Sequence, residues 1–125
     1  MSKTILLVDD ETDIVELLTI RLKASGFEVI SAMDGQEALD KVKQKAPDLI
    51  LLDEMMPKIS GFKVCGLLKA DSRFKHIPII IHTARVAHEE DIALSKQLGA
   101  DLLVSKMIKF EDLVDKINEL VNKDG

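Results

Sequence analysis

The sequence contains no tryptophan, no tyrosine and no long run of apolar residues. Without Trp or Tyr, stacking on nucleic-acid bases is disfavoured. The net charge of −5 and the absence of a basic stripe also argue against direct nucleic-acid contact. No apolar segment approaches the roughly 20 residues that cross a bilayer, and the first residues, SKTILLVDDE, lack the pattern of a secretory signal. We therefore expect a cytoplasmic protein with no membrane insertion.

Cysteine is also scarce. Cys65 stands alone, so it can form no internal disulfide, and no metal-ligand spacing surrounds it. We expect Cys65 to be a small buried residue on a helix. The length of 125 residues suits one domain with a substantial core, and the 46% hydrophobic and 31% charged content is ordinary for a globular protein.

Short β-rich runs alternate with helix-length segments along the chain. The runs are TILLV, FEVISA, DLILL, IPIIIH and DLLVS, at residues 4–8, 27–32, 48–52, 77–82 and 101–105. All except FEVISA are nearly continuously apolar, which is typical of strands buried on both faces. Apolar residues recur at helical spacing after each run, most weakly over 88–98. The alternation predicts an α/β fold, (βα)₅, with a doubly wound parallel sheet.

Polar residues follow four of the five predicted strands. In chain order they are Asp9, Asp10 and Glu11, then Asp53 and Glu54, then Thr83, and finally Lys106. The carboxyl ends of parallel strands share one edge of a doubly wound sheet, and ligands bind there. Taken singly, Asp10 and Thr83 could cap helices and Lys106 could be a solvated surface residue. Their convergence on one edge is what indicates a site.

The composition of this set suggests its chemistry. Clustered carboxylates of Asp9, Asp10 and Asp53 would repel one another and raise their pKa values unless a cation lay among them. Mg²⁺ prefers oxygen ligands and typically takes one or two carboxylates. Lys106 and Thr83 would add a positive charge and a hydroxyl donor for an incoming anion. The set therefore predicts a site that stabilises a phosphoryl group.

Four segments resemble a known family. They are ILLVDDE, LILLDEMMP, IIIHTA and GADLLVSK, and they occur in the family's order and spacing along the whole chain. Each motif alone is weak, but the four in register are specific. The sequence resembles the receiver domains of two-component response regulators, and among these the stand-alone, chemotaxis-regulator type. The resemblance implies a flavodoxin-like five-stranded parallel sheet of order 2-1-3-4-5, and a single receiver domain over residues 1–125 with no output domain.

The resemblance also implies how a phosphoryl group would be accepted. Asp53 would receive it from a sensor histidine kinase, a histidine phosphotransfer protein or a small donor such as acetyl phosphate. Asp10, Asp53 and the backbone carbonyl of Met55 would hold Mg²⁺ directly, and Asp9 would hold it largely through water. The protein would catalyse its own aspartyl phosphorylation and dephosphorylation and would not turn over a free substrate.

The same resemblance implies how the phosphorylated state would be read. Lys106 would pair with a phosphoryl oxygen, and the Thr83 hydroxyl would move to hydrogen-bond the aspartyl phosphate. This movement would bias the domain toward an active state that an unknown downstream protein recognises.

Leu103 and Met107 depart from the family pattern, which has an aromatic residue and a proline at these positions. Leu103 either fills the space of the aromatic ring or alters the surface that reports activation. The family's lysine–proline bond is usually cis, whereas a cis bond before another residue costs roughly 2.5–4 kcal/mol. We therefore expect a trans Lys106–Met107 bond and a Lys106 amine that reaches the site less reliably.

Three further residues bear on the site. His82 stands where the family usually has an apolar residue. Strand alternation predicts that it faces away from the phosphoryl site, half-buried and with no metal or phosphorelay role. Met55 offers water no hydrogen bond, and Arg85 could reach the phosphate or close over it. We therefore expect slow autodephosphorylation.

Two alternative functions differ from this one in class. A receiver-like module could signal by protein contact without phosphorylation, which Leu103 and Met107 favour but the intact set of polar residues opposes. An aspartyl-nucleophile phosphatase would carry a D-x-D signature after the first strand. This sequence has VDDET there, and its adjacent aspartates argue against that class.

Overall fold

The computed structural model describes residues 2–84 and 88–122. Within these residues, strands and helices alternate strictly. They are β1 (Thr4–Val8), α1 (Thr12–Ala24), β2 (Glu28–Ala32), α2 (Gly35–Gln44), β3 (Leu49–Asp53), α3 (Gly61–Lys69), β4 (Ile79–Thr83), α4 (Glu89–Gln97), β5 (Leu102–Ser105) and α5 (Phe110–Val121). The predicted (βα)₅ order is confirmed, including a helix over the weakest segment.

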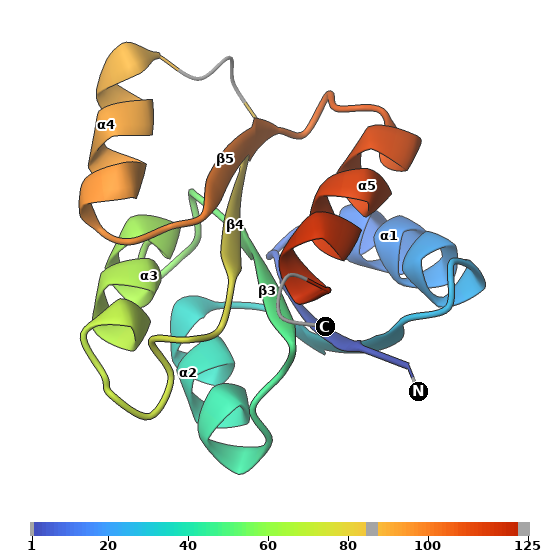
Figure 1. Cartoon of the computed structure of the whole chain (residues 1–125), viewed down its shortest axis with the longest axis horizontal. Coiled ribbons are helices and arrows are strands. Elements are labelled where there is room, and N and C mark those ends of the chain that lie inside the picture. Colours follow the sequence, from blue (N-terminus) through green and yellow to red (C-terminus); the bar gives the residue numbers. More distant parts are fainter. Residues whose placement is uncertain (1, 85–87, 123–125) are drawn as a thin grey trace.

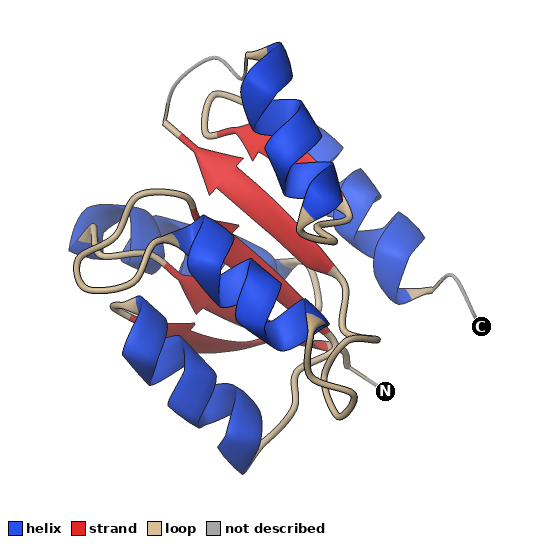
Figure 2. Ribbon diagram, turned by 90° about the vertical axis from the view of Figure 1, so that its left-hand side faces the viewer, coloured by secondary structure: helices blue, strands red, loops and turns tan. Residues whose placement is uncertain are grey.

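The strands form one parallel sheet. Its order is β2-β1-β3-β4-β5 across the described residues, so the chain reverses direction across the sheet between β1 and β3. Helices α1 and α5 cover one face, and α2, α3 and α4 cover the other (Figure 1). Figure 2 shows the strands lying between these helical layers. The predicted doubly wound, flavodoxin-like fold is confirmed.

The central strands supply two cores, because neighbouring side chains of a strand point to opposite faces. Ile5, Leu7 and Ile80 pack toward α1 and α5, in the same cluster as Leu22 and Leu113. Their sequence neighbours pack toward α2 and α3 in a cluster that includes Leu6, Val8, Ile81, Val64 and Cys65. The expected burial of Cys65 on a helix is confirmed.

Burial differs between central and edge strands. Every residue of β1, β3 and β4 is buried, which explains their continuous apolar character. The expectation of burial on both faces is wrong for β5, which is only partly buried because it lies at the sheet edge.

Glycines shape the connections around the sheet. Gly26 and Gly99 have positive φ angles of 98° and 93° and follow the ends of α1 and α4. Gly61 acts through its small size: a Cβ there would lie 2.1 Å from the backbone oxygen of Asp53. Its N–H also donates to the Glu54 carbonyl at 2.9 Å. The start of α3 therefore packs directly on the end of β3 and fixes the backbone of Asp53.

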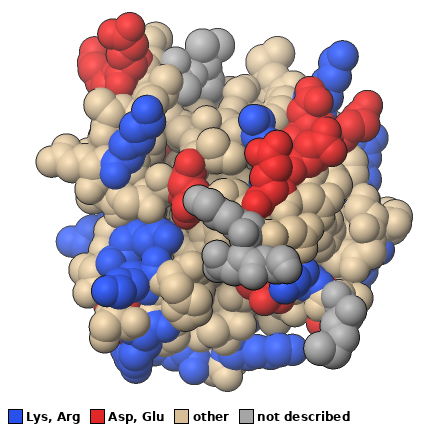
Figure 3. All heavy atoms as spheres, viewed as in Figure 1, with Lys and Arg blue, Asp and Glu red and all other residues tan. Residues whose placement is uncertain are grey.

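The surface carries charges of both signs. On the face seen in Figure 3, acidic side chains gather over α5 and basic side chains gather over the α3 side. In the first turn of α5 the acidic residues are Glu111 and Asp112. Within the described residues, none of the helices combines the length and apolarity that a bilayer crossing demands.

Candidate functional site

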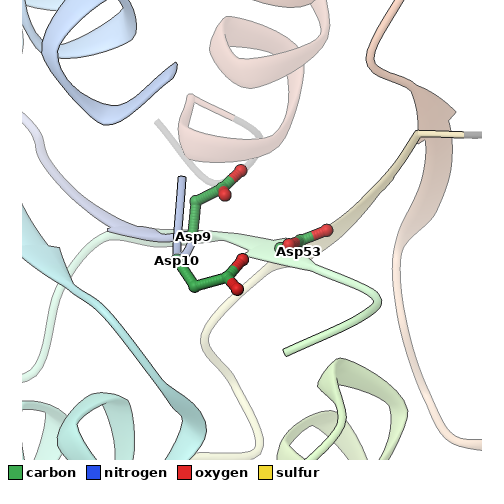
Figure 4. A group of neighbouring side chains, drawn as sticks. All are labelled: Asp9, Asp10 and Asp53. Carbon is green, nitrogen blue, oxygen red and sulfur yellow. The ribbon is translucent and has the colours of Figure 1, made fainter. Parts of the chain in front are cut away.

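Three carboxylates meet at the carboxyl edge of the sheet (Figure 4). Asp9 and Asp10 follow β1, and Asp53 is the last residue of β3. One carboxylate oxygen from each lies within 4.8 Å of the others. Asp9 and Asp53 are buried and Asp10 is exposed. The Glu11 N–H donates to Oδ1 of Asp9 at 2.9 Å, which holds that side chain in place. The structure thus brings together the carboxylates that the sequence placed at one edge.

The Lys106 amine lies among these carboxylates. Its Nζ atom is 2.9 Å from Oδ2 of Asp9, 3.3 Å from Oδ1 of Asp53 and 3.3 Å from Oε1 of Glu11. The backbone holds the lysine as well, since its N–H donates to the Thr83 carbonyl at 2.7 Å. One cation therefore partly neutralises three carboxylates.

The sequence predicts that a trans Lys106–Met107 peptide bond weakens the placement of the Lys106 amine. The Lys106–Met107 peptide is trans, as predicted. The Lys106 amine nevertheless lies beside both Asp9 and Asp53, so a cis bond is not needed to bring it to the site, and its lower reliability stays a prediction. The Met107 N–H donates to Oγ of Ser105 at 3.0 Å, and the Thr83 carbonyl anchors the Lys106 backbone. These two hydrogen bonds turn the chain at the end of β5 without a proline.

Burial and charge shift the ionisation of the site. Burial, followed by the negative charge of Asp9, raises the pKa of Asp53 to about 6, against the opposing effects of Lys106 and the Met55 N–H. Burial alone would lower the pKa of Lys106, but its hydrogen bonds and ion pairs with Asp9 and Asp53 raise it overall. A raised carboxylate pKa is therefore found at Asp53, with burial as its largest cause and the clustering with Asp9 as the second.

The donor set suits a divalent cation. Oδ2 of Asp9 is buried and forms an ion pair with the Lys106 amine at 2.9 Å. A carboxylate oxygen has two lone-pair sites, so this ion pair leaves capacity for a second cation. Three converging carboxylates are the hard oxygen ligands that Mg²⁺ takes in proteins. Asp9, Asp10 and Asp53 fit such an ion.

A cavity of about 120 Å³ lies over Asp53 and is called here the charged cavity. Its lining consists of Glu11, Asp53, Glu54, Met55, Thr83, Ala84 and Lys106. Thr83 is buried at the end of β4, next to the strand that carries Asp53. The cavity thus has a carboxylate, an ammonium and a hydroxyl side chain in its wall, the combination that stabilises a phosphoryl group.

Two acidic residues of the cavity had no role in the sequence-based prediction. Glu11 pairs with Lys106, and Glu54 lines the cavity as a buried residue. Their positions directly after Asp10 and Asp53 were the available signal. A residue one step past a strand end can point to either side, so spacing alone could not assign them.

His82 lies on the other side of the sheet from the charged cavity. It lines a different cavity, between α1 and α5, so the prediction that it faces away from the phosphoryl site is confirmed. It is more buried than expected, with 4% of its surface exposed. Burial, followed by the charge of Lys106, lowers the pKa of His82 to about 4, and Asp9 opposes this shift. Among the described residues, His82 belongs to no cluster that could hold a metal.

The remaining departures from the family pattern lie around the site. Leu103 is partly buried and packs against the core on the α2–α3 side of the sheet. Met55 and Met107 expose 73% and 83% of their surfaces. Arg85, expected near the phosphate, lies outside the described residues. The proposed effect of these residues on autodephosphorylation stays a prediction.

Solved structures of similar fold include signalling proteins. Chemotaxis protein CheY4 of Vibrio cholerae matches with a TM-score of 0.89 at 29% sequence identity, over 96% of this chain and 99% of that chain. Response regulator protein TrrA of Thermotoga maritima, solved in complex with Mg²⁺ and BeF, matches with a TM-score of 0.84 at 39% identity. That match covers 94% of this chain and 98% of TrrA.

Sequence comparisons agree with the structural ones. The alkaline phosphatase synthesis transcriptional regulatory protein PhoP of Bacillus subtilis is 40% identical over 123 residues, which are 98% of this chain and 50% of PhoP. The DNA-binding response regulator MtrA of Mycobacterium tuberculosis is 39% identical over 117 residues, 94% of this chain and 50% of MtrA. The chain spans about half the length of these curated relatives. The family model of the response regulator receiver domain matches residues 5–118, and the chain belongs to that family.

Proposed function

We propose that this chain is a phosphorylation-dependent switch of two-component signalling in which Asp53 accepts the phosphoryl group. The donor would be a sensor histidine kinase or a histidine phosphotransfer protein. The observation that carries the proposal is the meeting of the Asp53 carboxylate, the Lys106 amine 3.3 Å away, and the carboxylates of Asp9 and Asp10. Membership of the receiver domain family supports the same class of signalling.

Asp53 is suited to act as the nucleophile. Its pKa of about 6 leaves the carboxylate mostly ionised at neutral pH. One of its oxygens attacks phosphorus and forms the new O–P bond. The P–N bond to the donor histidine breaks, and its electron pair stays on the imidazole nitrogen, which then binds a proton. Dephosphorylation reverses the modification: water attacks phosphorus, inorganic phosphate leaves, and the Asp53 carboxylate is restored.

Lys106 and Thr83 would respond to the new group. The Lys106 amine exchanges its contacts with Asp9 and Asp53 for a phosphoryl oxygen, and the Thr83 hydroxyl donates a hydrogen bond to another. The Lys106 N–H already donates to the Thr83 carbonyl at 2.7 Å, so the two residues are joined through the backbone. A shift of Thr83 would therefore be transmitted to the end of β5 and bias the domain toward an active state.

The carboxylates would hold the cofactor. Asp10, Asp53 and the backbone carbonyl of Met55 would bind Mg²⁺ directly, and Asp9 would bind it largely through water. The ion supplies positive charge against the phosphoryl oxygens and the carboxylates around them. The convergence of Asp9, Asp10 and Asp53 supports this assignment, and the relative TrrA was solved with Mg²⁺ and BeF.

We also propose that residues 1–125 act as one cytoplasmic receiver domain that works through an unknown downstream protein. The net charge of −5 supports a protein partner rather than direct nucleic-acid contact by these residues. The catalytic activity proposed is limited to phosphorylation and dephosphorylation of its own Asp53.

Phosphotransfer tests the proposal. The chain is incubated with Mg²⁺ and acetyl phosphate. Mass spectrometry then measures the intact mass and, after chemical reduction of the aspartyl phosphate, the acid-stable product at residue 53. We expect one phosphoryl group on the wild type and none on Asp53→Ala. Asp101→Ala, which removes an aspartate at a different edge of the sheet, serves as the matched control and should label normally. Equal labelling of wild type and Asp53→Ala would refute the assignment.

The alternative of a receiver-like module that works without phosphorylation rests on Leu103. Its aliphatic side chain packs partly buried where the family has an aromatic residue, so the family's readout has no ring to move. Beryllofluoride separates the two functions. Large spectral changes along β4 and β5 on adding Mg²⁺ and beryllofluoride support the switch. A labelled Asp53 with an unchanged β4–β5 surface would support the alternative.

A further inference from the structure

Another cavity, of about 170 Å³, lies between α1 and α5 and is called here the α1–α5 pocket. Its walls are mostly apolar side chains of these two helices, such as Leu18, Phe110 and Leu113. Polar residues among its lining are Arg21, His82 and Lys106. The two helices that line it, α1 and α5, cover the sheet face opposite α2, α3 and α4 (Figure 1). The proposed phosphorylation chemistry does not use it, although Lys106 lines both cavities.

His82 gives the pocket an unused polar atom. The residue is 96% buried, since only 4% of its surface is exposed, and Nε2 has no hydrogen-bond partner among the described residues. A neutral imidazole nitrogen can donate or accept one hydrogen bond, according to its tautomer. A buried polar atom in this state favours an occupant that supplies the missing partner.

The charge and size of the pocket restrict the occupant. No carboxylate belongs to its lining, and Arg21 is a cation, whereas the amine of Lys106 is paired with carboxylates of the charged cavity. The Arg21 guanidinium lies 5.4 Å from the centroid of the Phe110 ring, so the positive charge stands at an aromatic wall. These surroundings favour an electron-rich ring and an acidic hydroxyl. Cavities of about 150 Å³ lined by aliphatic and aromatic side chains bind a single benzene ring, so the volume suits one ring.

We propose that the α1–α5 pocket is a binding site for a small phenol. The ring would pack against Leu18 and Leu113, and the hydroxyl would exchange a hydrogen bond with Nε2 of His82. Nothing in the proposed phosphoryl transfer requires this site. An occupant would also contact Lys106, which lines the charged cavity as well. Binding of the occupant and phosphorylation of Asp53 would therefore influence each other. This coupling rests on the proposed function.

Titration with small probes tests the site on the full chain. Backbone amide NMR spectra are recorded with phenol and, separately, with benzene, which lacks the hydroxyl, in the absence of Mg²⁺ and phosphodonor. We expect saturable shifts confined to α1, the start of α5 and β4, with a Kd for phenol at least tenfold lower than that for benzene. This comparison needs no variant, so loss of folding cannot obscure it.

Two variants sharpen the result. His82→Leu removes Nε2 at similar volume and should bring the affinities for phenol and benzene to within about twofold. His76→Leu makes the same change at an exposed histidine and should leave the tenfold preference intact. Leu18→Trp fills the pocket and should abolish the binding of both probes, with well-dispersed spectra showing that the fold is kept.

Three outcomes would overturn the proposal. They are the absence of saturable shifts, equal affinity of the wild type for the two probes, and shifts that map to the charged cavity instead. Because the titration uses neither Mg²⁺ nor a phosphodonor, its failure would leave the role of Asp53 untouched. Failure of Asp53 labelling would equally leave this site untouched.

Discussion

Two neighbouring residues at the end of β4 face different cavities. Thr83 lines the charged cavity over Asp53, whereas His82 lines the α1–α5 pocket. The alternation of strand side chains separates them by the thickness of the sheet. In the charged cavity, Lys106 partly neutralises the carboxylates, while the α1–α5 pocket combines apolar walls with Arg21 and an imidazole. One strand thus lines a charged cavity on one face and a mostly apolar pocket on the other, and Lys106 borders both.

Replacing the shared residue should have the largest effect. Lys106→Met keeps the length of the side chain but removes the cation that lies within 3.3 Å of both buried aspartates. We expect the rate of Asp53 labelling by acetyl phosphate to fall about 100-fold, because a preorganised charge at the transferring group is lost. Initial rates from a mass-spectrometric time course measure this. Lys109→Met, at an exposed lysine nearby in the sequence, is the control. A fall of less than threefold would mean that the amine does not assist transfer.

Neutralising Asp53 should stabilise the fold. Asp53→Asn removes a buried carboxylate whose pKa is raised from 3.8 to about 6, so we expect the free energy of unfolding at pH 7 to rise by about 2–3 kcal/mol. Urea unfolding with EDTA measures it.

The sign of the pH dependence checks this reasoning. Because the folded state binds the Asp53 proton more tightly than the unfolded state, wild-type stability relative to Asp53→Asn should increase as the pH falls from 7 through 6 toward 4. A difference between the two proteins that stays constant over this range would contradict the raised pKa.

The opposite side of β4 should give a smaller effect. His82→Leu replaces a buried nitrogen that lacks a partner among the described residues, and we expect a gain of about 1 kcal/mol at pH 7. The folded-state pKa of about 4 lies below the unfolded value of 6.5, so wild-type stability should be lost as the pH falls below 6.5. The advantage of His82→Leu should therefore grow in acid. Urea unfolding at pH 7 and pH 5 measures both effects. The control His76→Leu should keep the free energy of unfolding of the wild type.

The rim of the charged cavity should give the smallest effect. Met55 is exposed and its thioether cannot orient an attacking water. We expect slow autodephosphorylation of the wild type and an increase of about threefold to tenfold in Met55→Asn, whose amide can hydrogen-bond to water. Loss of the phosphoryl mass with time, in Mg²⁺ and without phosphatase, measures it. Wild-type loss within seconds would contradict the expectation.

The sequence was sufficient for the fold and for the edge at which the site lies. Continuous apolar runs predict buried parallel strands, and the carboxyl ends of such strands share one edge. The sequence alone could therefore place together the polar residues at these ends, which are Asp9, Asp10, Asp53, Thr83 and Lys106. The same rule predicted that His82 faces away from them. These inferences rest on the alternation of side chains along a strand, which can be read from the local sequence.

Features that depend on contacts between distant residues could not be predicted. The N–H of Lys106 donates to the carbonyl of Thr83, 23 positions away, and a local rule about proline could not reveal this anchor. The partial exposure of β5 follows from its place at the sheet edge, which its apolar sequence does not reveal. The full burial of His82 likewise comes from two helices that cover one strand.

The ion pairs of Lys106 have a consequence for selectivity among anions. A free anion such as inorganic phosphate must displace Asp9, Asp53 and Glu11 from the amine and also overcome repulsion by the same carboxylates. A phosphoryl group bonded to Asp53 faces the same competition at a far higher effective concentration, because it is held within reach of the amine. The resting ion pairs should therefore keep the domain unresponsive to cellular phosphate while allowing it to respond to covalent modification.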